Sequence, residues 1–222
     1  MAMSETSGSF SDLSVGGFTE ALASAAPVPG GGSAAAIAAA LAASLAAMVA
    51  RLSADRPRYA PYMKTHARAL EAAEGARLAL LRLADEDARA YAAFGDARRL
   101  PKETPEQASA RDAAVAAAAV TAAQVPLEVV RRCHALVHEV ESLAGRSNLN
   151  AASDLDVAAL LAQAAARGAA ANVIINIPSI DDKHSTGAML AEVEARLHEI
   201  DSAVARVHGQ VRSGNLRGPE SR

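Results

Sequence analysis

An acidic turn, Asp85-Glu86-Asp87, lies in the middle of a long stretch with helical periodicity. Asp is a poor helix former and adjacent carboxylates repel one another, so the turn is unusual inside a helix. Because consecutive residues of a helix point in different directions, at most one or two of the three carboxylates face inward, where a carboxylate can transfer a proton. The alternative is a solvated face on which Arg82 and Arg89 pair with the acids.

A glycine-rich loop, Gly30-Gly31-Gly32-Ser33, follows two prolines and precedes a long apolar run. The prolines forbid helix up to Pro29, and Ser33 is a good N-cap for the helix that follows. Free N–H groups at such a helix start, beside glycines that let a ligand approach the backbone, suit a carboxylate, phosphate or carbonyl oxygen. The alternative is a tight corner at which glycine only avoids a clash between neighbouring helices.

Three other groups of polar residues are open to a chemical or a structural interpretation. Lys102 stands on a loop in a chain that otherwise prefers arginine, so it has either a chemical role or a solvated one. His134 and His138 are four residues apart on one helix face, but the HExxH arrangement is missing and no third ligand is evident, so we expect no metal. Asn172 and Asn176 share a helix face, and burial would require partners for both amides.

The elements that position these residues are predicted to be long helices. The 222 residues are 51% hydrophobic and 3% aromatic, with no Trp. This composition favours a single all-α domain, a bundle of long helices without a sheet, in which alanine lets the backbones approach closely. The predicted helices cover residues 33–50, 58–96, 105–143, 153–177 and 183–211. The β-branched run at 172–177 is assigned to a helix because no second strand is evident to pair with it.

Apolar patterns predict how the first and last helices pack. The larger residues of the first helix recur at steps of 3 and 4, which predicts one core-facing stripe: Ile37, Leu41, Leu45, Met48 and Leu52. The last helix has a coiled-coil-like seam from Leu190 to Val207. Pro126 lies inside the 105–143 helix, so we expect a kink or break there, with the carbonyl near Ala122 left free.

The termini and the bulk properties narrow the class of protein. Residues 1–12 are Ser-rich and polar and are predicted to be a disordered tail, residues 13–211 one helical domain, and residues 212–222 a frayed tail. A net charge of -3 and few aromatic residues argue against nucleic-acid binding. The uncharged stretch 33–50 is mostly alanine and barely long enough for a span, so no membrane segment is expected. The single Cys133 suits a reducing, cytoplasmic location.

Six short motifs occur in the order and spacing of one protein family. They are Pro27-Val28-Pro29-Gly30-Gly31-Gly32-Ser33, Asp85-Glu86-Asp87-Ala88-Arg89-Ala90-Tyr91, Leu100-Pro101-Lys102 with Thr104, Val125-Pro126-Leu127, Ser147-Asn148 with Ser153-Asp154, and Asn172-Val173-Ile174-Ile175-Asn176. The chain resembles the cyclodeaminase half of formiminotransferase-cyclodeaminase and the stand-alone bacterial methenyltetrahydrofolate cyclohydrolases. The resemblance covers nearly the whole chain and does not include a formiminotransferase region.

The resemblance implies an all-helical homodimer that handles a tetrahydrofolate carrying a one-carbon unit, with no metal or nucleotide cofactor. Asp87 matches the acidic position of the family's turn, and Tyr91 takes the place of the family's Phe. Lys102 matches the lysine of the family's Leu-Pro-Lys motif. Arg89 departs from the family, which often has Glu there, and this departure bears on the exact reaction.

The chemistry of the family gives these residue types a reason. Either N10 of the folate attacks a formimino carbon on N5 and ammonia leaves, or water attacks the cationic 5,10-methenyl bridge. Both transition states carry positive charge near the bridge carbon, which a carboxylate stabilises. Asp87 is the first candidate for this carboxylate and Asp154 the second. Lys102 either protonates the leaving nitrogen or holds a folate carboxylate.

Substrate binding is assigned to the loop and to three amides. The loop of Gly30, Gly31, Gly32 and Ser33 is expected to position a polar edge or the glutamate tail of the folate, and Asn148, Asn172 and Asn176 to recognise the pterin. Three hypotheses follow: a folate one-carbon enzyme, either cyclohydrolase or cyclodeaminase; an inactive folate-binding protein on the same fold; or a structural helical dimer held by the last helix.

Overall fold

Long helices make up nearly all of the described chain. The structure, a computed structural model, describes residues 8–219, and this range contains no strand. The α-helices are α1 (Val15–Ala23), α2 (Gly31–Ala54), α3 (Met63–Arg98), α4 (Pro105–Leu143), α5 (Ala152–Asn176) and α6 (Lys183–Ser213). Short 3-10 helices are η1 (Phe10–Asp12), η2 (Pro57–Tyr62), η3 (Leu149–Ala151) and η4 (Ile177–Ser179). The prediction of an all-α fold is confirmed.

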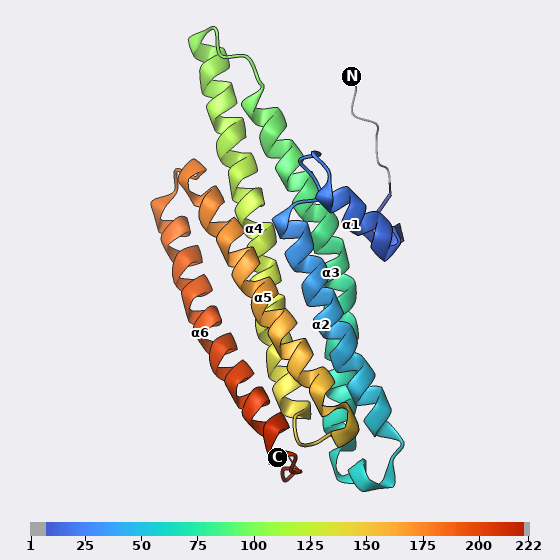
Figure 1. The fold of residues 1–222 in the computed structure, drawn as a ribbon. Coiled ribbons are helices and arrows are strands. Elements are labelled where there is room, and N and C mark those ends of the chain that lie inside the picture. Colours follow the sequence, from blue (N-terminus) through green and yellow to red (C-terminus); the bar gives the residue numbers. More distant parts are fainter. Residues whose placement is uncertain (1–7, 220–222) are drawn as a thin grey trace.

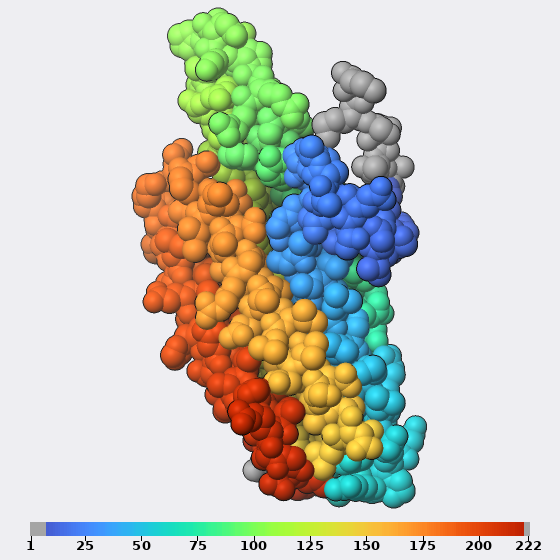
Figure 2. Space-filling view, viewed as in Figure 1, coloured from blue at the N-terminus to red at the C-terminus, as the bar shows by residue number. Residues whose placement is uncertain are grey.

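Helices α2 to α6 run side by side in an elongated bundle, and the short α1 lies outside them (Figure 1). α2 packs against α3 and α5, while α4 packs against α3, α5 and α6. The ends of α3 and α4 that meet at their connecting loop extend beyond the other helices, so this hairpin projects from the body (Figures 1 and 2). A residue at the tip of the hairpin therefore lies away from the rest of the bundle.

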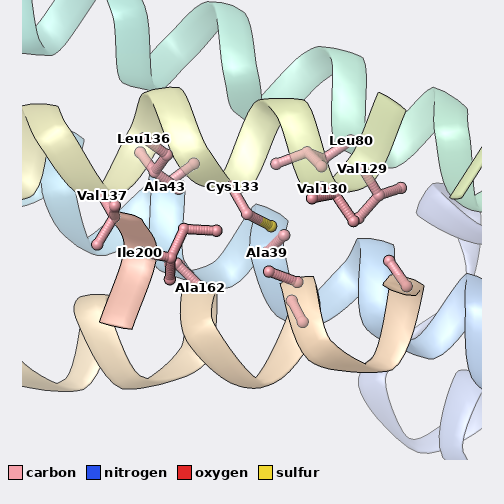
Figure 3. Close-up of a cluster of buried hydrophobic side chains, with 14 of the residues drawn as sticks. Ala39, Ala43, Leu80, Val129, Val130, Cys133, Leu136, Val137, Ala162 and Ile200 are labelled. Atoms are coloured by element: carbon pink, nitrogen blue, oxygen red, sulfur yellow. The ribbon is translucent and has the colours of Figure 1, made fainter. Parts of the chain in front are cut away.

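The core is built from alanine where α2 and α5 approach each other. Larger side chains of α3, α4 and α6 fill the remaining space, as Leu80, Cys133 and Ile200 do in Figure 3. Burial raises the pKa of the Cys133 thiol to about 12, so this cysteine is an inert core residue. The fully buried alanines of α2 and α5 include Ala36, Ala39, Ala43, Ala46, Ala50, Ala159, Ala162, Ala166 and Ala169.

The predicted packing stripe of the first helix is wrong. Leu41 is 55% exposed and Leu52 43%, Met48 is also exposed, and Ile37 and Leu45 are only partly buried. The alanine face of α2 lets it approach α3 and α5 more closely than a leucine face would, so the bulky side chains are left on the outside. The consequence is an apolar outer surface on α2.

Helix α4 is continuous from Pro105 to Leu143 although Pro126 lies inside it, so of the two predicted alternatives, a kink or a break, the break does not occur. The prediction that a nearby carbonyl is freed is confirmed, because Ala122 O accepts a hydrogen bond from Asn176 Nδ2 of α5 at 2.8 Å. Asn176 thus supplies the donor that a proline lacks. This hydrogen bond links α5 to α4 at the point where Pro126 interrupts the backbone hydrogen bonds of α4.

The predicted seam of the last helix faces its own chain. Val193, Ile200, Val204 and Val207 are buried, and α6 packs against α4 and α5. Leu190, at the start of the seam, is 40% exposed. Because the seam is used within one chain, it is not free to hold a second copy, and the structural-dimer hypothesis loses the feature that motivated it.

The structure differs from the predicted tails where it describes them. Phe10–Asp12 form η1, and the Asp85 carboxylate accepts hydrogen bonds from Ser9 Oγ at 2.6 Å and Phe10 N at 2.8 Å. At the other end, Tyr62 Oη donates to Arg217 O at 2.7 Å. Residues 1–7 and 220–222 of the predicted tails lie outside the described residues.

By length and composition, three helical segments of the described residues are apolar enough to cross a membrane: Gly31–Ala54, Pro105–Leu143 and Leu149–Ser179. In the first of them, 61% of the most apolar window is buried inside the bundle. The alanine that raises the hydropathy of α2 is the same alanine that forms the core.

Candidate functional site

A cleft near the loop before α2 gathers most of the polar residues that the sequence singled out. The cleft has a volume of about 650 Å³ and lies between residues 27–32, the second half of α3, the first half of α4 and the end of α5. Of the predicted site residues, Gly30, Gly31, Gly32, Asp87, Asn172 and Asn176 line it. Ser33 lies directly behind the loop, where it contacts Asp87.

Asp87 caps the N-terminus of α2 from the neighbouring helix α3. The N-cap residue of α2 is Gly30, which has no side chain to bind the first N–H groups. In its place the Asp87 carboxylate accepts hydrogen bonds from Ser33 Oγ, at 3.0 Å, and from the Ser33 backbone N–H. The prediction that Ser33 is the N-cap is therefore wrong. Ser33 is the third residue of α2, and its hydroxyl also donates to Ala84 O at 2.9 Å.

Gly32 is required for this close approach of Asp87 to α2. A Cβ atom at position 32 would overlap the Asp87 carboxylate, whereas one at position 31 would meet only Asn172 Nδ2, at 3.9 Å. The anion at the start of the helix is thus supplied by the chain itself. The Ser33 N–H therefore faces Asp87, whereas the prediction that Gly30, Gly31 and Gly32 position a polar edge or the glutamate tail of the folate stays a prediction.

Burial raises the pKa of the Asp87 carboxyl above its ordinary value, and the two hydrogen bonds from Ser33 act in the opposite direction. Loss of solvent is the larger of these effects, although the positive end of the α2 dipole also favours the ionised form. A carboxyl with a raised pKa, open to a cleft, is suited to accept and return a proton.

Asp85, the first residue of the acidic turn, has a structural role. Asp85 binds Ser9 and Phe10 of the N-terminal segment, so the interpretation of the turn as a solvated face is wrong for Asp85 as well as for Asp87. Arg89 is exposed and does not line the cleft. The departure of Arg89 from the family's Glu therefore lies outside the space in which a substrate would bind.

Asn172 and Asn176 present acceptors to the cleft. Asn172 Nδ2 donates to Gly168 O at 2.9 Å, and Asn176 Nδ2 donates to Ala122 O and Asn172 O, both at 2.8 Å. These backbone contacts use both N–H donors of Asn176 and one of the two of Asn172, and they fix the orientation of both amides. Within residues 8–219 no hydrogen bond reaches the Oδ1 atoms, which leaves two acceptors for a ligand.

Sequence reasoning missed two arginines that line the cleft, Arg98 and Arg111. They stand on α3 and α4, on either side of the connecting loop, and Arg111 Nε donates to Arg98 O at 3.2 Å. Tyr91 and Phe94 of α3 line the same wall, and the Arg98 guanidinium lies 5.9 Å from the centre of the Phe94 ring. Residues on either side of the turn of a helical hairpin become neighbours. The positions of Arg98 and Arg111 around the 99–104 loop could therefore have indicated that they lie together.

Lys102 does not join Asp87 within one chain. Lys102 is exposed in the loop of the projecting α3–α4 hairpin, its backbone N–H donates to Glu103 Oε2 at 2.9 Å, and its side chain does not line the cleft. The predicted partnership of the Asp87 carboxylate with this lysine is therefore absent from the cleft as one chain forms it.

Asn148 and Asp154 lie at the opposite end of the bundle from the cleft. Asn148 Oδ1 accepts from Asn150 N at 3.2 Å, and the Asn148 backbone N–H donates to Ser53 Oγ at 2.8 Å, so Asn148 shapes the loop before η3. Asp154 is in the first turn of α5. At about 1.5 Å per residue, Asp154 is roughly 27 Å along α5 from Asn172. Neither residue lines the cleft, which corrects their predicted places in the site.

Comparison with known proteins gives consistent matches over most of the chain. Residues 14–195 match the sequence pattern of formiminotransferase-cyclodeaminase. The chain is 38% identical over 196 residues to a methenyltetrahydrofolate cyclohydrolase of Methylorubrum extorquens, covering 88% of this chain and 94% of that protein. It is 34% identical over 200 residues to the mouse formimidoyltransferase-cyclodeaminase, covering 90% of this chain and 37% of that longer protein.

A solved structure has the same fold. The crystal structure of a formiminotetrahydrofolate cyclodeaminase from Thermotoga maritima superposes with a TM-score of 0.83 at 32% sequence identity, covering 91% of this chain and 98% of that one.

Proposed function

Because the chain belongs to the formiminotransferase-cyclodeaminase family, it is a folate one-carbon enzyme acting on C–N bonds of a tetrahydrofolate, and we propose that it hydrolyses the 5,10-methenyl bridge with Asp87 as the catalytic carboxylate. The observation that carries this proposal is the Asp87 carboxylate, with its raised pKa, at the head of α2 inside the cleft. The choice of hydrolysis is supported by the relative that is matched over 94% of its length, which is named as a cyclohydrolase.

The hydrolysis needs a base for water and an acid for the departing nitrogen, and Asp87 serves both steps in turn. Ionised Asp87 takes a proton from water as the water oxygen bonds to the bridge carbon. The carboxyl returns this proton to N5 as the bond between the bridge carbon and N5 breaks, and the remaining hydroxyl proton leaves to solvent, so that a formyl group stays on N10. Before attack, the same carboxylate stabilises the positive charge of the bridge.

The remaining residues of the cleft match the chemical parts of a folate. Arg98 and Arg111 are suited to hold the carboxylates of the glutamate tail, the role considered above for Lys102. The Oδ1 atoms of Asn172 and Asn176 are suited to accept hydrogen bonds from the amino and ring N–H groups of the pterin. Phe94 adds an aromatic face between these two polar regions.

Cyclodeamination is the second candidate, and the Thermotoga structure favours it, because that protein is a formiminotetrahydrofolate cyclodeaminase and matches over the whole fold. In that reaction N10 attacks the formimino carbon on N5, Asp87 moves the proton, and ammonia leaves. The two reactions are distinguished by assaying both substrates side by side. Hydrolysis lowers the methenyl absorbance when methenyltetrahydrofolate is supplied, whereas deamination raises it when formiminotetrahydrofolate is supplied. Turnover of neither compound would refute both reactions.

The assignment of Asp87 is tested by Asp87→Asn. The amide still accepts from Ser33 but can neither take a proton nor carry negative charge, so we expect turnover to fall by roughly 10² or more, with substrate affinity and melting temperature largely kept. Asp85→Asn is the matched control, because Asp85 contacts only the N-terminal segment, and its turnover should stay near the wild-type value. Near-normal turnover of the Asp87 variant would remove Asp87 from the mechanism.

We further propose that the protein acts as a homodimer in the cytoplasm and that the reaction uses no cofactor beyond the tetrahydrofolate substrate. Support for the homodimer comes from the outer surface of α2 and α5, which lie side by side (Figure 2). This surface exposes large apolar side chains: Leu41, Met48 and Leu52 on α2, and Val157 and Leu160 on α5. An apolar patch of this kind is self-complementary about a two-fold axis. Lys102 and Asp154 have no part in the proposed mechanism.

A further inference from the structure

A histidine and carboxylate cluster lies between α4 and α6, outside the cleft. His134 Nε2 is 3.3 Å from His138 Nε2 and 2.6 Å from Glu199 Oε2. The three donor atoms all lie within 4.8 Å of one another. The expectation that the His134–His138 pair has no third ligand is therefore wrong, because α6 supplies one that is 61 residues or more distant in sequence. We propose that His134, His138 and Glu199 form a site for a divalent transition metal, with Zn²⁺ as the ion best suited to it.

The spacing of the donors fits a tetrahedral ion. Two nitrogens that are each about 2.0 Å from a tetrahedral centre are about 3.3 Å apart, the separation that the two Nε2 atoms already have. The Glu199 oxygen has to retreat slightly from its present hydrogen bond, and it can do so because its side chain is 57% exposed. Two imidazoles and one carboxylate suit Zn²⁺ far better than Mg²⁺ or Ca²⁺, which prefer oxygen ligands.

The surroundings of His138 favour metal binding. His138 Nδ1 lies 3.8 Å from Glu141 Oε2, too far for a hydrogen bond, and Arg206 binds the same carboxylate through Nε at 2.6 Å and Nη2 at 2.8 Å. The negative charge of Glu141 nevertheless favours a proton on Nδ1. The Nε2 lone pair then points toward His134. A carboxylate behind a ligating imidazole is a common feature of zinc sites, where it fixes the tautomer and raises the basicity of the ligand.

Arg196 opposes metal binding at His134. Its Nη1 lies 3.1 Å from His134 Nδ1, which favours the tautomer that carries its proton on Nε2. When Nε2 binds a metal, that proton moves to Nδ1, and the guanidinium must turn away from the ring. Arg196 keeps a partner when it does so, because its Nε donates to Glu192 Oε1 at 2.8 Å. The site thus has three protein ligands. Arg196 weakens metal binding at His134, but its guanidinium can turn away.

A metal at this site would link α6 to α4 and would lie too far from the cleft to contact the substrate. His134 is about 18 Å along α4 from Ala122, which lines the cleft, at about 1.5 Å per residue. An ion that binds only the folded chain stabilises it by RT ln(1 + L/Kd), where L is the free ion concentration, so the melting temperature rises with the logarithm of the ion concentration once that exceeds the dissociation constant. The expected effect is therefore greater thermal stability, with folate turnover in the absence of metal unchanged by His138→Gln.

The test is calorimetric titration of ZnCl₂ into the full chain, freed of affinity tags and treated with EDTA, together with melting curves with and without ZnCl₂. We expect one Zn²⁺ per chain and a rise in melting temperature that MgCl₂ does not produce. His138→Gln should weaken Zn²⁺ binding by at least about tenfold and abolish the rise. Arg196→Gln should tighten Zn²⁺ binding, because the amide oxygen can accept a hydrogen bond from the Nδ1–H that His134 carries when its Nε2 binds the metal. His208→Gln, which changes another exposed α6 histidine, should bind Zn²⁺ like the wild type.

Two results would overturn the proposal. One is a wild-type protein whose melting temperature does not respond to ZnCl₂. The other is a His138→Gln variant that retains wild-type affinity for Zn²⁺, which would place any bound ion elsewhere on the chain. His138 is the preferred position for the substitution because its side chain is 42% exposed, so the variant is expected to fold.

Discussion

Asp87, which we propose to be the catalytic carboxylate, also caps a helix. Its carboxylate receives the Ser33 hydroxyl and N–H, which stabilise the ionised form, while burial stabilises the protonated form. A change in either influence alters the proton affinity of the group that we propose to be catalytic. The two neighbours that control these influences, Ser33 and Gly32, therefore offer sharper tests than the removal of Asp87 itself.

Ser33→Ala should shift the pH dependence of the enzyme. The Ser33 hydroxyl lowers the pKa of Asp87, so its loss raises that pKa further. Activity that requires ionised Asp87 falls as the pH drops through this pKa, and the acid limb of kcat/KM should therefore move to higher pH. Ser44→Ala is the control, because the Ser44 hydroxyl donates only to Ala40 O within the same helix. An unchanged acid limb in the Ser33 variant would mean that another group controls it.

Gly32→Ala should damage catalysis more than Gly31→Ala. The new methyl group at position 32 overlaps the Asp87 carboxylate, which must then leave the head of α2. A displacement of about 1 Å can lower turnover by about 10²-fold, so a loss of this order is expected in kcat. At position 31 a methyl group finds room, and kcat should stay near the wild-type value. If the two substitutions lowered kcat equally, the close approach of Asp87 to Gly32 would not be what catalysis requires.

At the scale of the helices, α5 compensates for the proline of α4. Asn176 Nδ2 donates to the Ala122 carbonyl, which lacks its usual partner because Pro126 has no N–H. The same residue lines the cleft, so one side chain links the stability of α4 to the shape of the site.

A double-mutant cycle tests this compensation. Asn176→Ala should lower the free energy of unfolding by about 1–3 kcal/mol, the cost of leaving a buried carbonyl without a partner. In a Pro126→Ala background the restored N–H can bond to Ala122 O, so the same Asn176→Ala change should cost clearly less. Denaturant unfolding of the four proteins measures the coupling. Additive effects would show that Asn176 does not act on the carbonyl that Pro126 frees.

Features that depend on local sequence could be predicted well. Thr104 and Gln107 form the expected capping box at the start of α4, because all of its atoms lie within one turn. The continuation of α5 through Asn176 is also confirmed, because residues 8–219 contain no strand with which the β-branched run could pair. The acid at Asp87, the glycine loop and the amides of α5 could be named from motifs, and the structure brings them together.

Features that depend on how helices cross could not be read from the sequence. Size suggested that leucines face the core of α2, but the close crossing with α5 selects its alanines and leaves Leu41 outside. Ser33 looked like an N-cap, yet the cap is Asp87, 54 residues away. Asn148 and Asp154 share motifs with the site but lie at the far end of α5, a separation that only the direction of the helices determines.

At the scale of the whole molecule, the apolar surface of α2 and α5 is the proposed homodimer interface. A homodimer that buries this surface should dissociate when a charge is placed in it, so Leu41→Glu should elute as a monomer in size-exclusion chromatography with light scattering. Leu78→Glu is the control, because Leu78 is similarly exposed, at 49%, but stands on α3. A Leu41→Glu protein that keeps the mass of the wild type would place the interface on another face.

The alanine core of α2 also limits how this protein can change over generations. A single nucleotide change converts an alanine codon into one for glycine, serine, threonine, valine, proline, aspartate or glutamate. Every one of these except glycine is bulkier, charged, polar or incompatible with a helix, and glycine weakens a helix by about 1 kcal/mol. The buried alanines from Ala36 to Ala50 have no smaller helix-forming residue available to them. In a library of random point variants selected for activity, this helix face should therefore retain its parental residues more strictly than the leucines on the opposite face of the same helix.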